Sequence, residues 1–258
     1  MKKTFFVIII LIFIFISIRI ILPIPSQTTE KIPVPSPTIS QTETANKFIV
    51  YQNIKYNYGI IDTTNKNVNL ISNLEKKISG QKILDQDCRE LVNAGFYDTN
   101  NNHLGLFEIG GKTIQKRQAN NFLNGFIVSE KIGNYLISRE YDESEEVNFV
   151  LQSGPILYED SIPLKLAIKD DEPARRVVAI LSTNHNLYFM TVYTLDNYYS
   201  GPLLSNLPEI LKEVFINEKL NVNTALNLDG GSASLFYSSN IKLPEMTTVG
   251  GFFCINYK

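Results

Sequence analysis

Short runs of β-type sequence follow one another through most of this 258-residue chain, and they restrict its fold more than any other feature. Turn residues separate the runs, which include KFIVY, YNYGIIDT, NVNLI, LGLFEI, FLNGFIVS, NYLISR, VVAILS, NLYFMTVY, ALNLD, SASLFY and GGFFCINY. Many short strands and few helical patterns are typical of an α+β fold. Residues 48–258 are therefore predicted to form a single domain on a mixed, largely antiparallel β-sheet.

One helix is clearly marked within this domain. Asn206 is placed to cap it, Pro208 fits its first turn, and Glu209 completes an Asn-x-x-Glu capping box. An apolar stripe indicates a helix that packs on the core, and it consists of Leu207, Ile210, Leu211, Val214 and Phe215. A second, weaker helix is predicted over about residues 80–89.

The N-terminus has a different character. Lys2 and Lys3 precede a nearly unbroken apolar run over residues 5–22, which is long enough to cross a bilayer as a helix. No alanine occurs before Ala45 and no glycine before Gly59, so a cleavage site with small residues is missing. Residues 1–22 are therefore predicted to be an uncleaved signal anchor. Its two lysines would keep the N-terminus in the cytoplasm and place the domain outside.

Residues 23–47 are rich in Pro, Ser and Thr and show no apolar periodicity. This composition is typical of an extended linker that holds a domain away from a membrane. A disordered tail has the same composition, and the sequence does not separate the two interpretations.

Cys88 and Cys254 are the only cysteines in the chain. In an oxidising compartment they could form a disulfide that ties the final strand to the segment before NAGFY. Two unrelated buried thiols fit the sequence equally well. Neither cysteine has the CxxC spacing that redox catalysis or thiolate metal binding requires.

The stretch ALNLDGGSASLFY, residues 225–237, places two alternating runs around Gly230 and Gly231. Paired glycines between such runs favour a tight hairpin, because both can adopt positive φ. In that hairpin Asp229 would face Ser232, and Asn227 would face Ser234, so that one face is wholly polar. The polar face is either solvated or the floor of a ligand site.

Several classes of function are disfavoured. A net charge of −2 lacks the basic excess that is typical of nucleic-acid-binding proteins. GGSAS fails the G-x-S-x-G pattern of serine hydrolases at Ser234, and that pattern needs a strand-to-helix turn. His103 and His185 are the only histidines, and both are predicted to be surface or loop residues. Without a cluster of His and Cys, a zinc site is not predicted either.

ARRVVAI places Arg175 and Arg176 at the start of a strongly apolar strand. Because neighbouring residues of a strand point to opposite faces, at least one of these arginines could face a cleft beside the sheet. The planar guanidinium suits a phosphate or carboxylate. An exposed strand end is the alternative interpretation.

Six segments, in order, resemble the phosphodiester glycosidase family: NAGFYD, LGLFEIGG, NNFLNGF, QSGP, RRVVAI and ALNLDGGSASLFY. QSGP is assigned to a loop. The similarity extends from about Phe48 to Tyr257 and is greatest to the short bacterial branch associated with exopolysaccharide. The family has an Asp-Gly-Gly-Gly-Ser signature, and the corresponding segment of this chain, DGGS, has one glycine fewer.

The resemblance implies the following site residues. Those with catalytic roles are Asp229, Arg175 and Asn93. Those that bind substrate are Gly95, Asn124, Gln152, Ser153, Gly154, Arg176, Asn227, Gly230, Gly231 and Ser232. The sequence shows too few ligands to predict a metal site, and no cofactor is predicted.

The implied reaction is hydrolysis of the bond between sugar C1 and phosphate in a cell-surface glycopolymer. The leaving phosphate monoester has a second pKa of about 6, so its oxygen needs little protonation. An arginine would hold the phosphate, and Asp229 would act as base or nucleophile. The expected partners are a carbohydrate-phosphate substrate and, through residues 5–22, a membrane, but no nucleic acid. The alternatives are an exopolysaccharide-binding or assembly module that uses the same cleft, and glycosyl transfer to a hydroxyl other than water.

Overall fold

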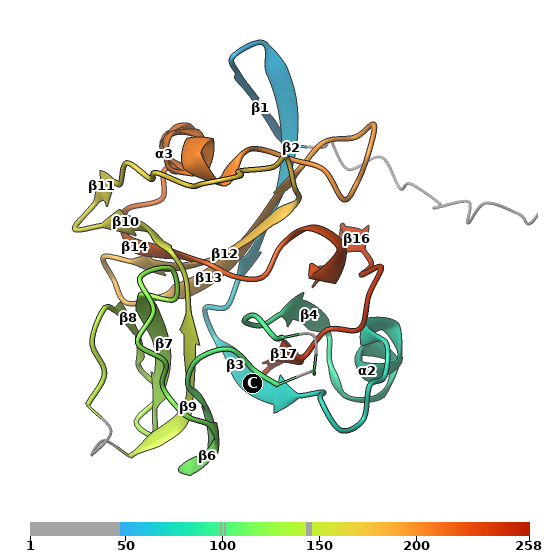
Figure 1. Cartoon of the computed structure of the whole chain (residues 1–258), viewed down its shortest axis with the longest axis vertical. Coiled ribbons are helices and arrows are strands. Elements are labelled where there is room, and N and C mark those ends of the chain that lie inside the picture. Colours follow the sequence, from blue (N-terminus) through green and yellow to red (C-terminus); the bar gives the residue numbers. More distant parts are fainter. Residues whose placement is uncertain (1–46, 99, 101, 143–145) are drawn as a thin grey trace, which may run out of the picture. The chain divides into compact units, whose positions relative to one another are not determined.

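The structure, a computed structural model, describes residues 47–258 apart from 99, 101 and 143–145. Three β-sheets and two α-helices make up this part of the chain (Figure 1). All strand pairings described are antiparallel, which confirms the predicted α+β class with few helices, although the strands form three sheets. No helix of the described residues is long and apolar enough to span a membrane. The predicted anchor over residues 5–22 lies outside the described residues, as does the linker through residue 46.

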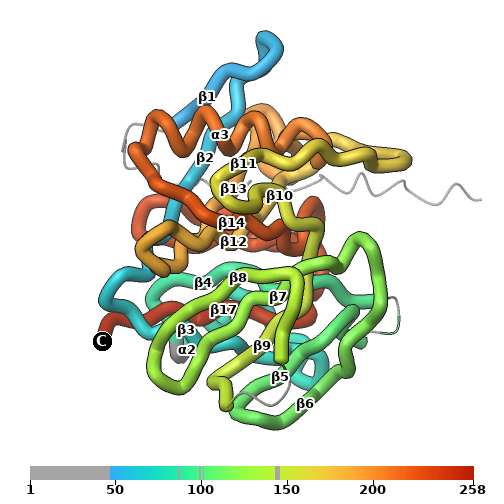
Figure 2. The backbone as a smooth tube through the Cα atoms, turned by 90° about the vertical axis from the view of Figure 1, so that its left-hand side faces the viewer, coloured from blue at the N-terminus to red at the C-terminus, as the bar shows by residue number. Residues whose placement is uncertain are grey.

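The largest sheet, sheet A, has seven strands. Their order is β1 (Phe48–Tyr51), β2 (Ile54–Asp62), β13 (Leu187–Tyr193), β12 (Arg176–Ser182), β14 (Val222–Asn227), β10 (Ile156–Glu159) and β11 (Ile162–Pro163). The hairpin of β1 and β2 projects beyond the rest of the domain in both views (Figures 1 and 2). The central strands β13, β12 and β14 are buried on both faces. Strands that are buried on both faces have nearly continuous apolar sequences, and this explains the composition of VVAILS and NLYFMTVY.

Sheets B and C have five strands each. Sheet B consists of β16 (Lys242–Leu243), β15 (Phe236–Tyr237), β4 (Glu90–Asn93), β17 (Gly251–Tyr257) and β3 (Lys66–Ser72), in that order. Sheet C consists of β6 (Lys112–Gln115), β5 (Phe107–Ile109), β9 (Val147–Ser153), β7 (Gly125–Glu130) and β8 (Tyr135–Ser138). Gln152 and Ser153 thus end strand β9, so the loop predicted for QSGP begins only at Gly154.

One apolar core joins the three sheets. It contains Phe189 and Leu226 from sheet A, Phe253 from sheet B, and Phe149 and Leu151 from sheet C, all buried. Burial of apolar side chains at this junction holds the sheets together.

Helix α3 (Leu207–Glu218) covers the other face of sheet A with the predicted apolar stripe. The predicted capping box is wrong, because the side chain of Asn206 makes no capping hydrogen bond. A 3₁₀ turn over Leu204–Asn206 extends the helix backwards, so Asn206 already has helical backbone angles. Asp171 caps this turn instead, accepting hydrogen bonds from the Leu204 and Ser205 amides at 2.9 and 2.8 Å.

Helix α2 (Gly80–Asp87) confirms the weaker helix prediction. Ser79 caps it, since its hydroxyl accepts a hydrogen bond from the Lys82 amide at 3.4 Å. Glu245 adds a second cap by accepting from the Gly80 amide at 2.7 Å. The helix packs on sheet B through Ile83.

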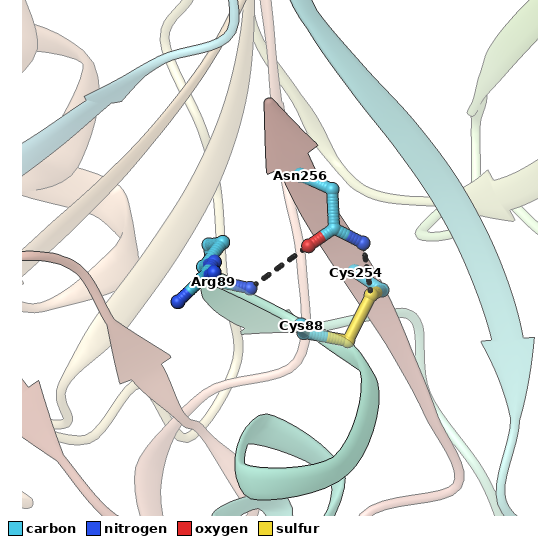
Figure 3. The surroundings of a disulfide bond; sticks show 4 residues. All are labelled: Cys88, Arg89, Cys254 and Asn256. Atoms are coloured by element: carbon cyan, nitrogen blue, oxygen red, sulfur yellow. Dashed lines mark hydrogen bonds between the residues drawn. A yellow bond between two sulfur atoms is a disulfide. The ribbon is translucent and has the colours of Figure 1, made fainter. Parts of the chain in front are cut away.

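Cys88 and Cys254 form a disulfide, so of the two alternatives left open by the sequence the bonded pair is the one present (Figure 3). The bond joins the end of α2 to strand β17, and the Cα atoms lie 5.4 Å apart. Beside it, the Arg89 amide donates to the Asn256 side chain at 3.0 Å. The final strand is thereby covalently fixed to the segment that leads into β4.

Replacing both cysteines with alanine is expected to lower the free energy of unfolding by about 2–5 kcal/mol, because the bond closes a long loop in the unfolded chain. Thermal melting of both proteins measures the change. Wild-type protein reduced with dithiothreitol should melt like the double variant. An unchanged melting temperature on reduction would contradict the prediction.

Candidate active site

The segment around Gly230 and Gly231 does not form the predicted hairpin. Strand β14 lies in sheet A, whereas β15 pairs with β4 and β16 of sheet B. A single 3₁₀ turn over Gly231–Ala233 connects the two sheets. The predicted pairings of Asp229 with Ser232 and of Asn227 with Ser234 are therefore wrong. Alternation along a strand defines its two faces, but it does not identify the neighbouring strand.

Each glycine of this crossing is required for a different structural reason. Gly230 is extended, and a Cβ atom there would lie 2.8 Å from the carbonyl oxygen of Arg175. Gly231 has a φ of +61°, which suits glycine, and its amide donates to the same carbonyl at 2.9 Å. The glycines allow the chain to turn closely past strand β12.

Asp229 lies at the centre of the crossing. Its amide donates to the Ala94 carbonyl at 3.3 Å, and its carboxylate accepts from the Gly230 amide at 2.8 Å. The residue is partly exposed, but its carboxyl group lies among closely packed atoms. This burial raises the pKa of Asp229 to about 7, against the opposing effect of the Gly230 hydrogen bond. A carboxyl group with this pKa can exchange a proton near neutral pH.

Asn93, the last residue of β4, holds Asp229 in place. Its amide nitrogen donates to the Asp229 carbonyl at 2.9 Å, and its amide oxygen accepts from the Leu235 amide at 2.8 Å. The side chain is fully buried. Because main-chain groups on both sides occupy its amide, Asn93 positions Asp229 and presents no free group to a substrate.

Arg175 is fully buried and faces away from solvent. Its guanidinium donates to the Ser234 hydroxyl at 2.6 Å, to the Ser234 carbonyl, and to the Pro244 carbonyl at 2.8 Å. Burial lowers its pKa to about 10, which leaves it charged at neutral pH. The phosphate contact that the resemblance implied for Arg175 is not available in this structure.

Arg176 is the arginine beside the glycine turn. Its Nη1 atom lies 3.8 Å from the position that a Cβ atom of Gly230 would occupy. Its other nitrogens donate to the carbonyls of Pro202 at 3.0 Å and Glu172 at 2.6 Å, and Nη2 lies 3.4 Å from the Asp171 carboxylate. Within the described residues, Nη1 has no hydrogen-bond partner. Arg176 therefore offers a fixed cationic group at the glycine turn, beside Gly230.

The predicted residues at the end of β9 join sheet C to sheet A. The Gln152 amide makes four main-chain hydrogen bonds, with Leu106, Leu123 and both backbone groups of Gln118. Ser153 donates to the Asn227 carbonyl at 2.8 Å. Both side chains are buried, so they support the site from behind rather than line it.

Three other predicted residues lie in the same junction. Asn227 donates to the Gly154 carbonyl at 2.9 Å, while its own side-chain oxygen is buried without a partner in the described residues. Asn124 accepts from the Ile156 amide at 2.8 Å. Gly95 packs against β9, since a Cβ atom there would lie 3.3 Å from the Gln152 carbonyl oxygen.

Ser232 is exposed at the crossing, and its carbonyl accepts hydrogen bonds from the Met246 and Thr247 amides at 2.8 and 3.2 Å. The loop over residues 244–249 is thereby attached beside Asp229.

Two residues near Asp229 were missed by the sequence interpretation. Tyr97 donates to the Thr248 carbonyl, and its pKa is raised mainly by burial and further by the charges of Asp229 and Glu245. Glu245 is thus a second carboxylate in the neighbourhood. Tyr97 lies within NAGFYD and could have been noticed there, whereas nothing in the sequence distinguishes Glu245.

The two histidines have no part in this arrangement. His185 is exposed in a turn, as predicted. His103 lies in the loop between β4 and β5, as predicted, but it is buried there, and its ring stacks on Phe107 at 3.7 Å between centroids. Burial lowers its pKa to about 4. Across the described ranges, no three His, Cys, Asp or Glu side chains are grouped closely enough to bind a metal ion.

A shallow depression of about 500 Å³ lies at the other end of β14, beside Val222 and the end of α3. Lys212, Lys219 and Asn221 contribute to its lining. It contains none of the residues around Asp229.

Residues 86–253, well over half of the chain, match the family model described as phosphodiester glycosidase. The chain belongs to the phosphodiester glycosidase family. The matched range includes Asp229, Arg176 and Asn93, and the resemblance inferred from six motifs is confirmed. A search of curated proteins finds no match.

Solved structures share the fold of this chain. The catalytic domain of zebrafish N-acetylglucosamine-1-phosphodiester alpha-N-acetylglucosaminidase, auto-inhibited by its pro-peptide, has a TM-score of 0.60 and 15% identity, over 83% of this chain and 82% of that domain. A hypothetical protein from Synechocystis has a TM-score of 0.58 and 11% identity. That match covers 83% of this chain but 61% of the Synechocystis protein. Family membership supports a glycosidase-type hydrolase of carbohydrate-phosphate substrates.

Proposed function

We propose that this chain is a membrane-anchored, extracytoplasmic hydrolase that cleaves the bond between C1 of a sugar and a phosphodiester oxygen in a cell-surface glycopolymer. The observation that carries the proposal is the carboxyl group of Asp229, whose pKa burial raises to about 7, on the turn where Gly230 lies close to the guanidinium of Arg176. An ionisable carboxyl group and a fixed cation are the two groups that this reaction requires.

Asp229 acts on the sugar side of the bond. As a base, its carboxylate takes a proton from water while the water oxygen bonds to C1. The electron pair of the C1–O bond leaves with the phosphate monoester, which needs little protonation at neutral pH. As a nucleophile, the carboxylate bonds to C1 directly, and water releases the sugar in a second step.

Arg176 acts on the phosphate side. Its Nη1 donors stand next to the turn that carries Asp229, and its remaining donors are held by protein carbonyls. The guanidinium is therefore oriented before the substrate binds, which lowers the entropic cost of binding an anion.

The disulfide and the N-terminal sequence support the proposed location. Disulfides persist in oxidising compartments, and Cys88–Cys254 fixes the last strand of the domain. The apolar run over residues 5–22 is long enough to anchor the chain in a membrane.

The pH dependence follows from the pKa of Asp229. Base or nucleophile catalysis requires the ionised carboxylate, so kcat/KM should fall tenfold per pH unit below about pH 7 and be level above it. Initial rates between pH 5 and pH 9 measure this profile. Activity that rises on acidification would show that Asp229 acts as an acid instead.

The function is tested with the whole 258-residue chain and synthetic glycosyl phosphodiesters that differ in the sugar, quantifying the released sugar and phosphomonoester. Equal release of both products from at least one substrate supports hydrolysis. If an alcohol is added and phosphomonoester is released without free sugar, the sugar has been transferred to the hydroxyl of the alcohol. Binding of a surface polysaccharide without any release would overturn the enzyme proposal in favour of a binding or assembly module.

A further inference from the structure

Two aromatic rings meet at the surface of the domain. The rings of Phe96 and Phe122 pack edge to face, with 5.5 Å between their centroids. Phe122 is 36% exposed and Phe96 is partly buried. An aromatic ring that is exposed to water gains the free energy of burial only when a ligand or partner covers it.

The loop that carries Phe122 is held rigidly from beneath. The buried amide of Gln152 bonds the backbone of Gln118 and the carbonyl of Leu123, at 2.7 to 3.0 Å. Asn120 accepts from the Phe122 amide at 2.7 Å. Gly154 allows the loop to approach, because a Cβ atom there would lie 1.9 Å from the Phe122 carbonyl oxygen. Phe122 is thus presented on a fixed support, which is typical of a binding residue.

Both rings are connected to the segment that carries Asp229. Phe96 follows Ala94 by two residues, and the Ala94 carbonyl accepts the Asp229 amide at 3.3 Å. Gly154, against which the Phe122 backbone packs, donates to the Asn227 carbonyl at 3.1 Å, two residues before Asp229. The ring pair therefore lies on two segments that are bonded to the chain at Asp229 and at Asn227, two residues before it.

We propose that Phe96 and Phe122 form an aromatic wall against which the C–H face of the sugar ring packs. Sugars carry one face of C–H groups, and an aromatic ring can cover such a face while the hydroxyls remain hydrogen-bonded to water or protein. This inference rests on the proposed function, because that function requires a sugar at Asp229. The wall would orient C1 toward the carboxylate, whereas Arg176 contacts only the phosphate.

The test compares wild type, Phe122→Ala and the conservative variant Phe122→Tyr. The matched control is Phe48→Ala, which removes a 49% exposed ring from the β1 hairpin. NMR titration measures binding of inorganic phosphate and of the methyl α-glycosides of N-acetylglucosamine, glucose, galactose and mannose. Kinetics on the best phosphodiester measure KM and kcat separately.

We expect Phe122→Ala to weaken binding of the preferred glycoside, and to raise KM, by about five- to tenfold, as for the loss of one aromatic contact. Phosphate binding should stay within twofold of wild type, and Phe122→Tyr should restore glycoside binding. A purely structural ring pair would instead lower the melting temperature and leave the glycoside affinity unchanged.

The outcomes separate this inference from the proposed function. Wild type that binds a glycoside through Phe122 but hydrolyses no phosphodiester upholds the wall and refutes the hydrolase. If wild type hydrolyses a phosphodiester and Phe122→Ala has the same KM as Phe48→Ala, the aromatic wall is refuted and the hydrolase is not. Failure of wild type to bind any glycoside of the panel also overturns the inference.

Discussion

Asp229→Asn should lower kcat for a glycosyl phosphodiester by about a thousandfold or more, because asparagine cannot act as base or nucleophile. The variant should keep its fold, since the asparagine side-chain oxygen can still accept the Gly230 hydrogen bond. Steady-state rates at pH 8, where wild-type Asp229 is ionised, measure the loss. Full activity in the variant would remove Asp229 from the mechanism.

The same substitution should stabilise the domain at alkaline pH. In the folded state the pKa of Asp229 is about 7, above its ordinary value of 3.8, so the folded protein binds the additional proton between about pH 4 and pH 7. Wild-type stability therefore falls as pH rises through this window, by up to about 4 kcal/mol. Asp229→Asn lacks this loss, so its melting temperature should exceed that of wild type at pH 8 and equal it at pH 4. A lower melting temperature at pH 8 would show that the carboxylate is stabilised by contacts other than those described above.

Arg175→Ala is expected to destabilise the domain by about 3–5 kcal/mol. The substitution leaves a large cavity and removes the hydrogen-bond donor of the carbonyls of Ser234, Pro244 and Tyr198, of which that of Ser234 is buried. Urea unfolding measures the change in free energy.

Arg176→Ala is the matched control for that experiment, because the neighbouring arginine is oriented to the glycine turn. It should cost about 1 kcal/mol in stability, while KM for a phosphodiester should rise by about a hundredfold, as for the loss of a charge-assisted contact to phosphate. A large loss of stability in Arg176→Ala and a large rise of KM in a folded Arg175→Ala would reverse the assigned roles.

The sequence predicted the class of fold and most of its elements because local patterns determine them. The stripe from Leu207 to Phe215 predicted α3, and the apolar runs at β12 and β13 predicted two strands, which the structure places in the middle of sheet A. Pairing over long distances was less accessible. Nothing in ALNLDGGSASLFY shows that β14 and β15 enter different sheets, since that choice depends on contacts with β4 and β12, far away in the chain.

The candidate site was located from motifs, but the roles of its residues depend on hydrogen bonds across the fold. Asn93 and Gln152 have the residue types that bind sugar hydroxyls, and only the structure shows that main-chain groups occupy their amides. Arg175 and Arg176 are adjacent in sequence, and alternation places them on opposite faces without saying which face is the site. Asp171 and Glu245 act as caps on distant helices, and no local pattern reveals such a contact.

The most direct test of the account determines which bond breaks. The whole chain is incubated with its best glycosyl phosphodiester in ¹⁸O-labelled water, and both products are analysed at once by mass spectrometry. Attack at C1, centred on Asp229, predicts that the label enters the sugar and that the phosphomonoester contains none. Label in the phosphomonoester would mean cleavage of the P–O bond and would contradict a glycosidase mechanism.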